Sequence, residues 1–412
     1  MANAVWIGAQ TARAKVVTVT VSSSTVGHTF TLTTGTGKSI SYAAVSGDTT
    51  TTIAAAILVL AAAMQQTEGD WAELTFSENT ANVFTVTGPA DGAPFTFTAG
   101  GTGTMTATQT TAPLSPHDAN DTANYSTGAL PVDATDALIF ENSSVDMRYN
   151  LDAIAAIALT SGERRTSYRG RIGLPDTAAG GYREFRTKEL SLNTASIIWD
   201  QSGEDSFQQF RLLNVTTGGA TTLTSVGDGT IPPVGNEVLE VRGLPASSVA
   251  NLTGASARFA PYVGQACTIM TLTALNSTIT IGPSMTLSGT LNLTSCQGRI
   301  LSSWTTSLTM DGVSSDVEIA GSAAGVVIID GGRMRWKSTG AVGASPYIGS
   351  EGILDFSEAP STLTPSGTVQ IYAGGSLIDP AGRFRNFAVK LNRCTLAEVT
   401  IVIPNDKTLT LS

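Results

Sequence analysis

The feature that most constrains the fold of this chain is a series of short apolar segments in its C-terminal third, each followed by a turn. Strand-length segments at roughly 8–12-residue spacing, with no helix signal between them, are typical of a sandwich, a barrel or a parallel β-helix. The expected strands are Thr268–Leu272, Thr278–Ile281, Thr290–Leu293, Ser307–Met310, Val317–Ile319, Val326–Ile329, Met334–Trp336, Ile353–Phe356 and Val369–Tyr372.

Repeated phrases within this region favour the parallel β-helix. The segment Met285–Leu293 reads MTLSGTLNL, and a coil can repeat such short apolar faces without long hairpins. In the segment Val326–Ile329 we expect Ile328 to take part in coil packing. The sequence therefore predicts a mainly β protein whose C-terminal part is a parallel β-helix-like region.

Composition limits the partners of such a protein. Only 14% of the 412 residues are charged, against about 25% in an average protein. The formal net charge of −10 and the pI near 4.7 argue against nucleic-acid binding, because phosphate affinity rests on clustered Lys and Arg. The apolar run Ile53–Met64 is too short to span a bilayer, and nothing at the N-terminus reads as a signal peptide. We expect a protein made in the cytoplasm, with no membrane partner.

A small α+β module is expected between residues 15 and 112. Alternating apolar and polar residues mark half-buried strands, and Gly-Pro and Asp-Gly turns separate the later ones. We expect all of them in one sheet. These strands are Val17–Val21, Phe30–Leu32, Ala72–Phe76, Val83–Val86 and Phe95–Phe97.

The single long helix expected in the module runs from about Thr50 to Gln66, with Asp48 or Thr49 as its cap. Apolar residues recur along it at i, i+4, i+7 and i+11, which places them on one face. We expect this face to lie on the sheet. It consists of Ile53, Ile57, Leu60 and Met64.

A stretch rich in Thr and Gly, Gly100–Thr111, is followed by Pro113 and Pro116 and reads as a linker. The chain is long enough for two or three packed units. We therefore expect an N-terminal segment at 1–14, the module at 15–112, a β-rich middle domain at 113–265 and the β-helix-like domain at 266–412.

Two separated segments resemble the start of β-helical passengers of bacterial autotransporters and of similar phage-particle proteins. In those families a Trp-x-Gly closely precedes the phrase aNWs.G.lP...D...F. Here the first part is Trp6–Gly8, and the second is residues 118–140, reading DANDTANYSTGALPVDATDALIF, with Tyr125 in place of the Trp. The module at 15–99 separates the two parts, which identifies it as an insertion.

Two further segments are similar to phage proteins. Residues 47–64, reading GDTTTTIAAAILVLAAAM after a Thr-rich hairpin, resemble small domains of tail and virion proteins, and residues 375–400 resemble the C-terminal coils of phage-associated β-helical proteins. The resemblances imply a virion structural protein, made in the host cytoplasm, such as a head-decoration protein, a fibre or a tail fibre.

The sequence has no strong match to a cofactor-binding motif. Residues 35–39 read GTGKS, but Leu32 stands where a phosphate-binding loop needs its first Gly, and the following residues 40–42 alternate like a strand. A hairpin turn explains the glycines better. The three widely spaced cysteines, Cys267, Cys296 and Cys394, are expected to be buried free thiols.

The chain holds only two histidines, His28 and His117. It therefore offers few residues for a histidine-based metal site or for a Ser/His/Asp catalytic triad. Residues 118–124 offer oxygen ligands but lack the Gly and the distal Glu of a calcium loop. A turn stabilised by side-chain to backbone hydrogen bonds is the favoured interpretation. We expect no cofactor.

Glycoside cleavage needs two acids about 5–9 Å apart across the bond. Two candidate sets lie beside turns, where acids are ordinarily solvated or bonded to the backbone, and we expect none to be catalytic. Three aromatic residues could stack on sugar rings, although aromatics along β coils more often fill the interior. The acids are Asp311, Asp316 and Glu318, and Asp355 with Glu358; the aromatics are Trp304, Trp336 and Tyr372.

The densest basic cluster consists of Arg164, Arg165, Arg169 and Arg171. It is either a solvated face or a docking surface for an acidic neighbouring subunit, since Arg is enriched at interfaces.

Together these features predict a non-enzymatic virion appendage that presents a trimeric β surface for assembly or host attachment, because a three-fold oligomer covers open strand edges. Its partners would be its own copies, other capsid or tail proteins, and host surface glycan. The alternative is a glycan-binding or polysaccharide-degrading tailspike. A secreted adhesin is a third possibility, which the lack of a signal peptide disfavours.

Overall fold

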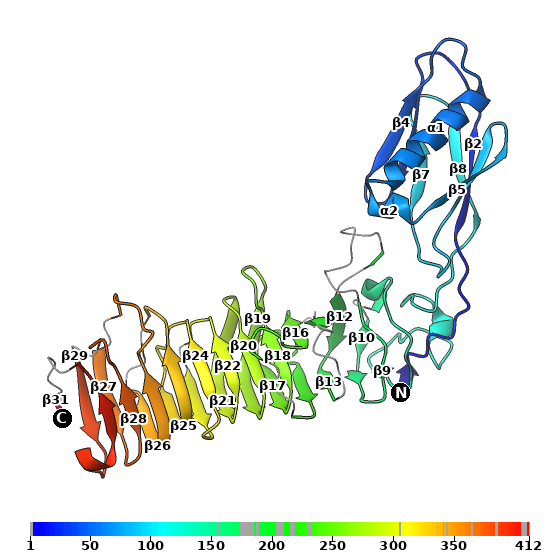
Figure 1. The fold of residues 1–412 in the computed structure, drawn as a ribbon. Helices are drawn as coiled ribbons and strands as arrows, with labels where there is room; N and C mark the ends of the chain where they lie inside the picture. Colours follow the sequence, from blue (N-terminus) through cyan, green and yellow to red (C-terminus); the bar gives the residue numbers. More distant parts are fainter. Residues whose placement is uncertain are drawn as a thin grey trace.

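The protein is an elongated parallel β-solenoid that carries a small module near its N-terminus, as Figure 1 shows for the computed structural model. The solenoid makes about 11 turns over residues 137–402, which confirms the predicted fold class. The residues described are 3–154, 157–173, 185–186, 189–202, 210–214, 219–229, 233–304, 306–340, 342, 345–363, 366–383, 386–404 and 410–411.

Each turn of the solenoid lays its strands parallel to those of the turn before. β20 (Thr278–Ile281) pairs with β22 (Gln297–Ile300), and β22 pairs with β24 (Asp316–Ile319), so each of these turns advances the chain by 19 residues. The first turns are longer. For example, β11 (Ser161–Arg164) pairs with β13 (Ser196–Asp200), which lies 35 residues further along the chain. Uneven turn lengths explain why no fixed period is visible in the sequence.

The remaining strands of the solenoid are β1 (Asn3–Val5), β9 (Ala137–Phe140), β10 (Ala158–Leu159), β12 (Glu189–Thr194), β14 (Phe210–Asn214), β15 (Thr222–Val226), β16 (Leu239–Arg242), β17 (Ser248–Thr253), β18 (Ser256–Phe259), β19 (Cys267–Leu275), β21 (Met285–Thr294), β23 (Ser307–Asp311), β25 (Val327–Trp336), β26 (Tyr347–Asp355), β27 (Ser366–Ile371), β28 (Ser376–Ile378), β29 (Asn386–Leu391), β30 (Thr400–Val402) and β31 (Thr410–Leu411). Short 3-10 helices lie at Thr122–Asn124, Leu151–Ile154 and Leu396–Glu398.

Three strand segments per turn give the middle of the solenoid three faces. Strands β19 and β21 shift register at a bulge, between Ile269 and Thr271 of β19. A bulge bends a strand, so the first and second halves of β19 and β21 belong to different faces. Face A consists of the first halves, up to Met270 and Ser288, and of the bridge between Trp304 and Ala323.

Face B consists of the second halves of β19 and β21 with β13, β15, β17 and β23. Face C consists of β18, β20, β22 and β24, together with the second halves of β25 and β26. Between faces B and C the backbone takes a left-handed conformation in successive turns, with φ of +48° at Asn276, +53° at Ser295 and +82° at Gly312. Asn and Gly suit this corner because they tolerate positive φ.

One hydrophobic core runs through the solenoid from Ala4 to Val389, and a second core fills the module. The β-helical region therefore begins near residue 137 and not near 266 as expected, since β17 and β19 pair across that position. The long loops of the early turns hide the repeat. Within β25, Ile329 is fully buried and Ile328 is only half-buried, so Ile328 does not hold the interior position expected of it.

The N-terminal segment is part of the solenoid, because β1 pairs in parallel with β9. Trp6 packs edge-on against Tyr125, with ring centroids 5.5 Å apart, and its indole N–H donates to the Val145 carbonyl at 2.9 Å. The chain leaves and re-enters the solenoid side by side, where Arg13 and Leu114 form an antiparallel bridge. The module is therefore an insertion between β1 and β9, as expected.

The module holds two antiparallel sheets and not one. The strand order is β5-β6-β2-β8 in the first sheet and β4-β3-β7 in the second. Helix α1 (Thr50–Gln65) contacts strands of both. The strands are β2 (Val16–Val21), β3 (Thr29–Thr34), β4 (Ser39–Ala43), β5 (Thr75–Thr80), β6 (Val83–Thr87), β7 (Phe97–Gly100) and β8 (Met105–Thr111).

Helix α1 matches its prediction. Thr49 is the N-cap, and it forms a reciprocal capping box with Thr52. Ile53 and Ile57 are buried, while Leu60 and Met64, which complete the expected stripe, are half-buried and pack against the same core.

Two other expectations in the module are wrong. The expected strand 72–76 begins instead as the short helix α2 (Gly69–Ala72), and strand β5 follows it. The expected linker 100–111 contains β8, which pairs with β2 along its length. Most of its Thr side chains are exposed at this sheet edge, so its composition resembles that of a linker.

Candidate functional site

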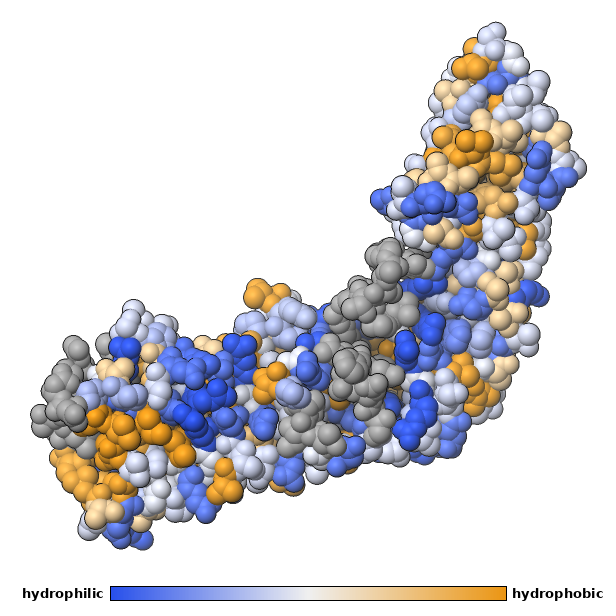
Figure 2. All heavy atoms as spheres, viewed as in Figure 1, coloured by the Kyte–Doolittle hydropathy of each residue, from blue (hydrophilic) through white to orange (hydrophobic). Residues whose placement is uncertain are grey.

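Charged side chains form a ladder along face C, where three of the five acids considered for glycan cleavage lie and a fourth, Glu358, follows in the turn after β26. The strand register places Arg299, Glu318, Arg335 and Asp355 beside one another on successive turns. Their side chains point away from the core, because the flanking positions in these strands are buried, although the Asp355 side chain is itself covered and only 3% exposed. Figure 2 shows the corresponding hydrophilic patch midway along the solenoid, over β22 and β24.

The ladder pairs its acids with bases. Glu318 forms ion pairs with Arg299, 2.8 Å from Nε to Oε1, and with Lys337, 2.9 Å from Nζ to Oε2. Asp355 accepts from Arg333 Nε at 2.8 Å. Two more pairs complete the network: Arg335 with Asp316 at 2.7 Å, and Lys337 with Glu358 at 2.7 Å.

The partners of Glu318 and Asp355 lower the pKa values of these two acids. Burial alone would raise the pKa of Glu318, but Lys337 and Arg299 outweigh it and hold that pKa below its ordinary value. Burial would also raise the pKa of Asp355. Hydrogen bonds from Ser357 and the positive charge of Arg333 outweigh this effect, so the pKa of Asp355 is lowered as well. A general acid for glycoside cleavage needs a raised pKa at neutral pH. Both carboxylates are instead suited to holding adjacent turns in register.

The fifth candidate acid, Asp311, lies at the corner of faces B and C. It follows Met310, whose partner Ile329 precedes Asp330 on the next turn. Burial, and then the charge of Asp311, raise the pKa of Asp330. A carboxyl group whose pKa is raised by a second carboxylate beside it is a pattern found in acid–base catalytic sites.

Two tyrosines lie beyond this acid pair. Tyr347 and Tyr372 are half-buried, with ring centroids 4.5 Å apart. The strand register sets Tyr347 beside Ile328, two residues before Asp330. Burial, then Tyr372 and lastly the charge of Asp330, raise the pKa of Tyr347. Asp311, Asp330, Tyr347 and Tyr372, which we call the corner set, are the arrangement that best suits contact with a sugar. Sequence reasoning missed Asp330 and Tyr347, because only the strand register brings them together.

The other two aromatic candidates fill the interior. Trp304 is 2% exposed and Trp336 is fully buried, and their rings lie 6.4 Å apart in the core. They are therefore unable to stack on a ligand outside the coil.

The basic cluster does not form one surface. Arg164 is buried and donates to the carbonyls of Asp200 and Tyr168, so it is a packing residue and not a docking residue. Arg165 is exposed but paired with Glu141 at 2.6 Å and Glu163 at 2.9 Å.

The other two members of the cluster, Arg169 and Arg171, are exposed.

The segment 118–124 is a turn, as expected. Asp118 accepts from the Asn120 backbone at 2.9 Å, and Asp121 accepts from the Ala123 backbone at 3.2 Å. Buried Asn124 donates to the carbonyls of Ser115 and Asp118. Within the described parts of the chain, no three His, Cys, Asp or Glu residues gather in a way that suits a metal ion.

The remaining sequence candidates have structural explanations. Residues 35–38 connect the antiparallel strands β3 and β4, with Gly37 at φ +82°, which confirms the hairpin turn. All three cysteines are free; Cys267 and Cys296 are buried, and Cys394 is half-buried.

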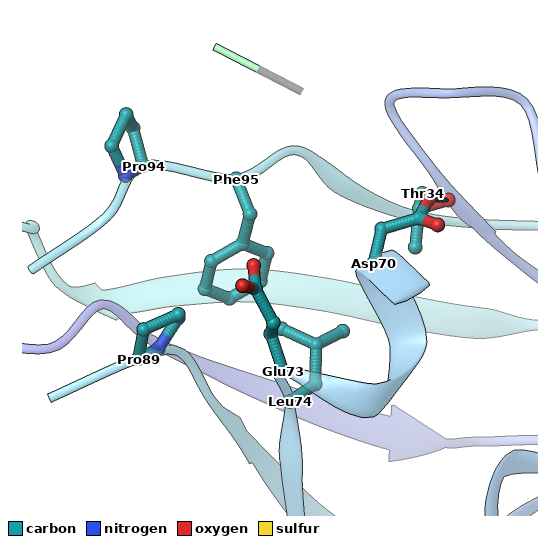
Figure 3. A pocket seen from close by; sticks show the side chains of 7 residues that line it. All are labelled: Thr34, Asp70, Glu73, Leu74, Pro89, Pro94 and Phe95. Atoms are coloured by element: carbon teal, nitrogen blue, oxygen red, sulfur yellow. Dashed lines mark hydrogen bonds between the residues drawn. The ribbon is translucent and has the colours of Figure 1, made fainter. Parts of the chain in front are cut away.

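A pocket in the module is lined by the apolar side chains of Leu74, Pro89, Pro94 and Phe95 and by Thr34, Asp70 and Glu73 (Figure 3). Both carboxylates are engaged by other residues. Thr34 donates to Asp70 at 2.9 Å, and Arg186 of the solenoid pairs with Glu73 at 2.7 Å. The pocket thus lies at a contact between module and solenoid.

No known protein family matches this chain, and no curated protein is similar to it in sequence. Among the described helices, none combines the length and the apolar character needed to cross a bilayer.

Proposed function

We propose that this chain is a non-enzymatic structural protein of a phage particle, a trimeric appendage such as a head-decoration protein, a fibre or a tail fibre. The observation that carries the proposal is the continuous solenoid of about 11 turns with a module inserted at its first turn. At about 4.8 Å per turn the solenoid is a rod of roughly 50 Å. A rod with one core presents extended surfaces and places the module at one end.

The chemistry of the outer surface supports the same proposal. Four of the five candidate acids are held in ion pairs that hold neighbouring turns together, and the pKa values of Glu318 and Asp355 are lowered there. A protein built this way contributes binding surface and rigidity. Its partners are its own copies and neighbouring capsid or tail proteins, and exposed Arg169 and Arg171 are available for an acidic neighbour.

The experiment uses particles purified from a culture that encodes this chain. Copies of the chain per particle are counted by quantitative mass spectrometry, and infectivity is measured on the same preparation. We expect the chain in the particles in multiples of three. A chain that is abundant in the lysate and absent from purified particles contradicts the proposal.

A glycan-binding or glycan-cleaving tailspike is the second candidate, and the corner set favours it. Asp330→Asn and Asp311→Asn separate the two functions, because neither side chain supports the coil interior. An appendage without enzymatic activity keeps normal incorporation and infectivity with either change. Normal incorporation with lost infectivity, and with loss of reducing-sugar release from host glycan, establishes the tailspike.

A further inference from the structure

We infer that faces A and B of the middle turns are the surfaces through which three copies of this chain pack, with face A of one chain against face B of the next. This inference rests on the proposed trimer and names the surface that it uses.

The first observation is a lack of charge. Between Phe259 and Asp311 the chain holds one charged residue, Arg299, and that residue lies on face C. Along face B the central outward positions of six successive strands are also uncharged. They are Ile198, Thr224, Asn251, Thr273, Asn292 and Thr309.

The contrast with face C shows that this is not a general property of the solenoid. Face C carries the ladder of charged Arg and Glu side chains described above, as is expected of a face that stays in contact with water. The cores of protein interfaces are depleted of charged residues, because an ion that is buried between two chains loses its hydration. The charged residues of face B, Asp200 and Asp311, lie at the ends of β13 and β23, at the corner with face C, so the rest of faces A and B can be covered without that cost.

The second observation is that the two uncharged faces adjoin. They meet at the bulge of β19, where Met270 is 42% exposed although it is apolar. On face A the outward positions Thr268, Thr286, Ser288 and Ser303 are again uncharged. A two-fold dimer uses one self-complementary face, whereas a ring uses two different faces of each chain. Two adjoining faces therefore fit a closed ring of three.

The third observation is size. Six strands about 4.8 Å apart, each with five residues at about 3.3 Å, make face B roughly 29 by 17 Å. Face A is narrower, with four residues in each of its segments Cys267–Met270 and Met285–Ser288. Over its four turns a contact between the two faces covers roughly 19 by 13 Å, about 250 Å² of projected area on each chain. The three contacts of a closed ring therefore cover about 1,500 Å² in all, and this sum reaches the size of a specific interface.

The test places lysines on each face of the full-length chain and measures mass by light scattering. One variant combines Thr273→Lys with Asn292→Lys on face B, and another combines Thr286→Lys with Ser288→Lys on face A. The control is Gln297→Lys, at an exposed position of face C. We expect three times 42.4 kDa for the wild type and the control, and 42.4 kDa for each face variant.

The results of this experiment distinguish an error in the assigned packing surface from an error in the proposed trimer. A wild-type trimer whose folded face variants remain trimers overturns the assigned surface and leaves the trimer standing. A wild-type monomer or dimer overturns the trimer itself. Circular dichroism establishes that each variant is folded.

Oxidation of the wild-type chain by hydrogen peroxide gives a test that needs no folded variant. Met285 is 3% exposed and serves as the buried reference. In the trimer we expect Met270 to oxidise as slowly as Met285. Rapid oxidation of Met270 in a sample of trimeric mass overturns the inference.

Discussion

Replacing Ile57 by Asp tests how the module is held together. Ile57 is 1% exposed on the inner side of α1, so the change removes a buried aliphatic side chain and places a charge there. Losing the side chain costs about 2–5 kcal/mol, and an unpaired buried charge adds several kcal/mol. The module is expected to be stable by about 5–15 kcal/mol, so Ile57→Asp should unfold it.

Val59 provides a matched control, because it is 70% exposed on the same helix. Val59→Asp introduces the same charge without burying it, and surface changes usually alter stability by less than about 0.5 kcal/mol. The two cores are separate, so calorimetry of the full chain should show one transition for each. We expect Ile57→Asp to abolish the module transition and Val59→Asp to keep both. An unchanged module transition in Ile57→Asp refutes the assigned face.

Three further outcomes are expected. Glu318→Gln should lower the free energy of unfolding by about 1 kcal/mol at pH 7. Because the folded pKa of Glu318 is lowered, this difference should shrink as the pH falls below its ordinary 4.5, as denaturant titrations at several pH values would show. Cys267 and Cys296 should resist iodoacetamide at pH 8 until the chain unfolds, because burial raises the pKa of Cys267 to about 12 and that of Cys296 above its ordinary value; mass spectrometry would detect early alkylation. Ile329→Asp should prevent folding of the solenoid, while Ile328→Asp should be tolerated, with circular dichroism as the measurement.

Much of the solenoid follows from local pattern. Alternating segments such as Thr278–Ile281 and Thr290–Leu293 predict strands, because one side of each segment is apolar and turn residues follow. Near a bulge or a corner, the alternation of apolar and polar residues no longer shows which side of the strand faces the core. In Val326–Ile329 the pattern alone does not decide which side faces inward, and Ile329 turned out to be the buried residue.

Contacts between turns were harder to predict, since they depend on turn length. Arg299, Glu318, Arg335 and Asp355 are separated by 19, 17 and 20 residues, and oppositely charged residues at this spacing were a usable signal for the ladder. The corner set gives a weaker signal, because Asp330 and Tyr347 belong to strands whose bulge shifts the register. Arg164 looked exposed in sequence only because charged residues are rarely buried.

The most direct test of the proposed function is a low-resolution electron-microscopy map of particles from a culture that encodes this chain, compared with particles from which the chain has been deleted. We expect a three-fold appendage on the head or the tail whose rods are roughly 50 Å long, and we expect the deletion to remove it. Two identical maps, with no density that depends on the chain, would show that the chain is not part of the particle.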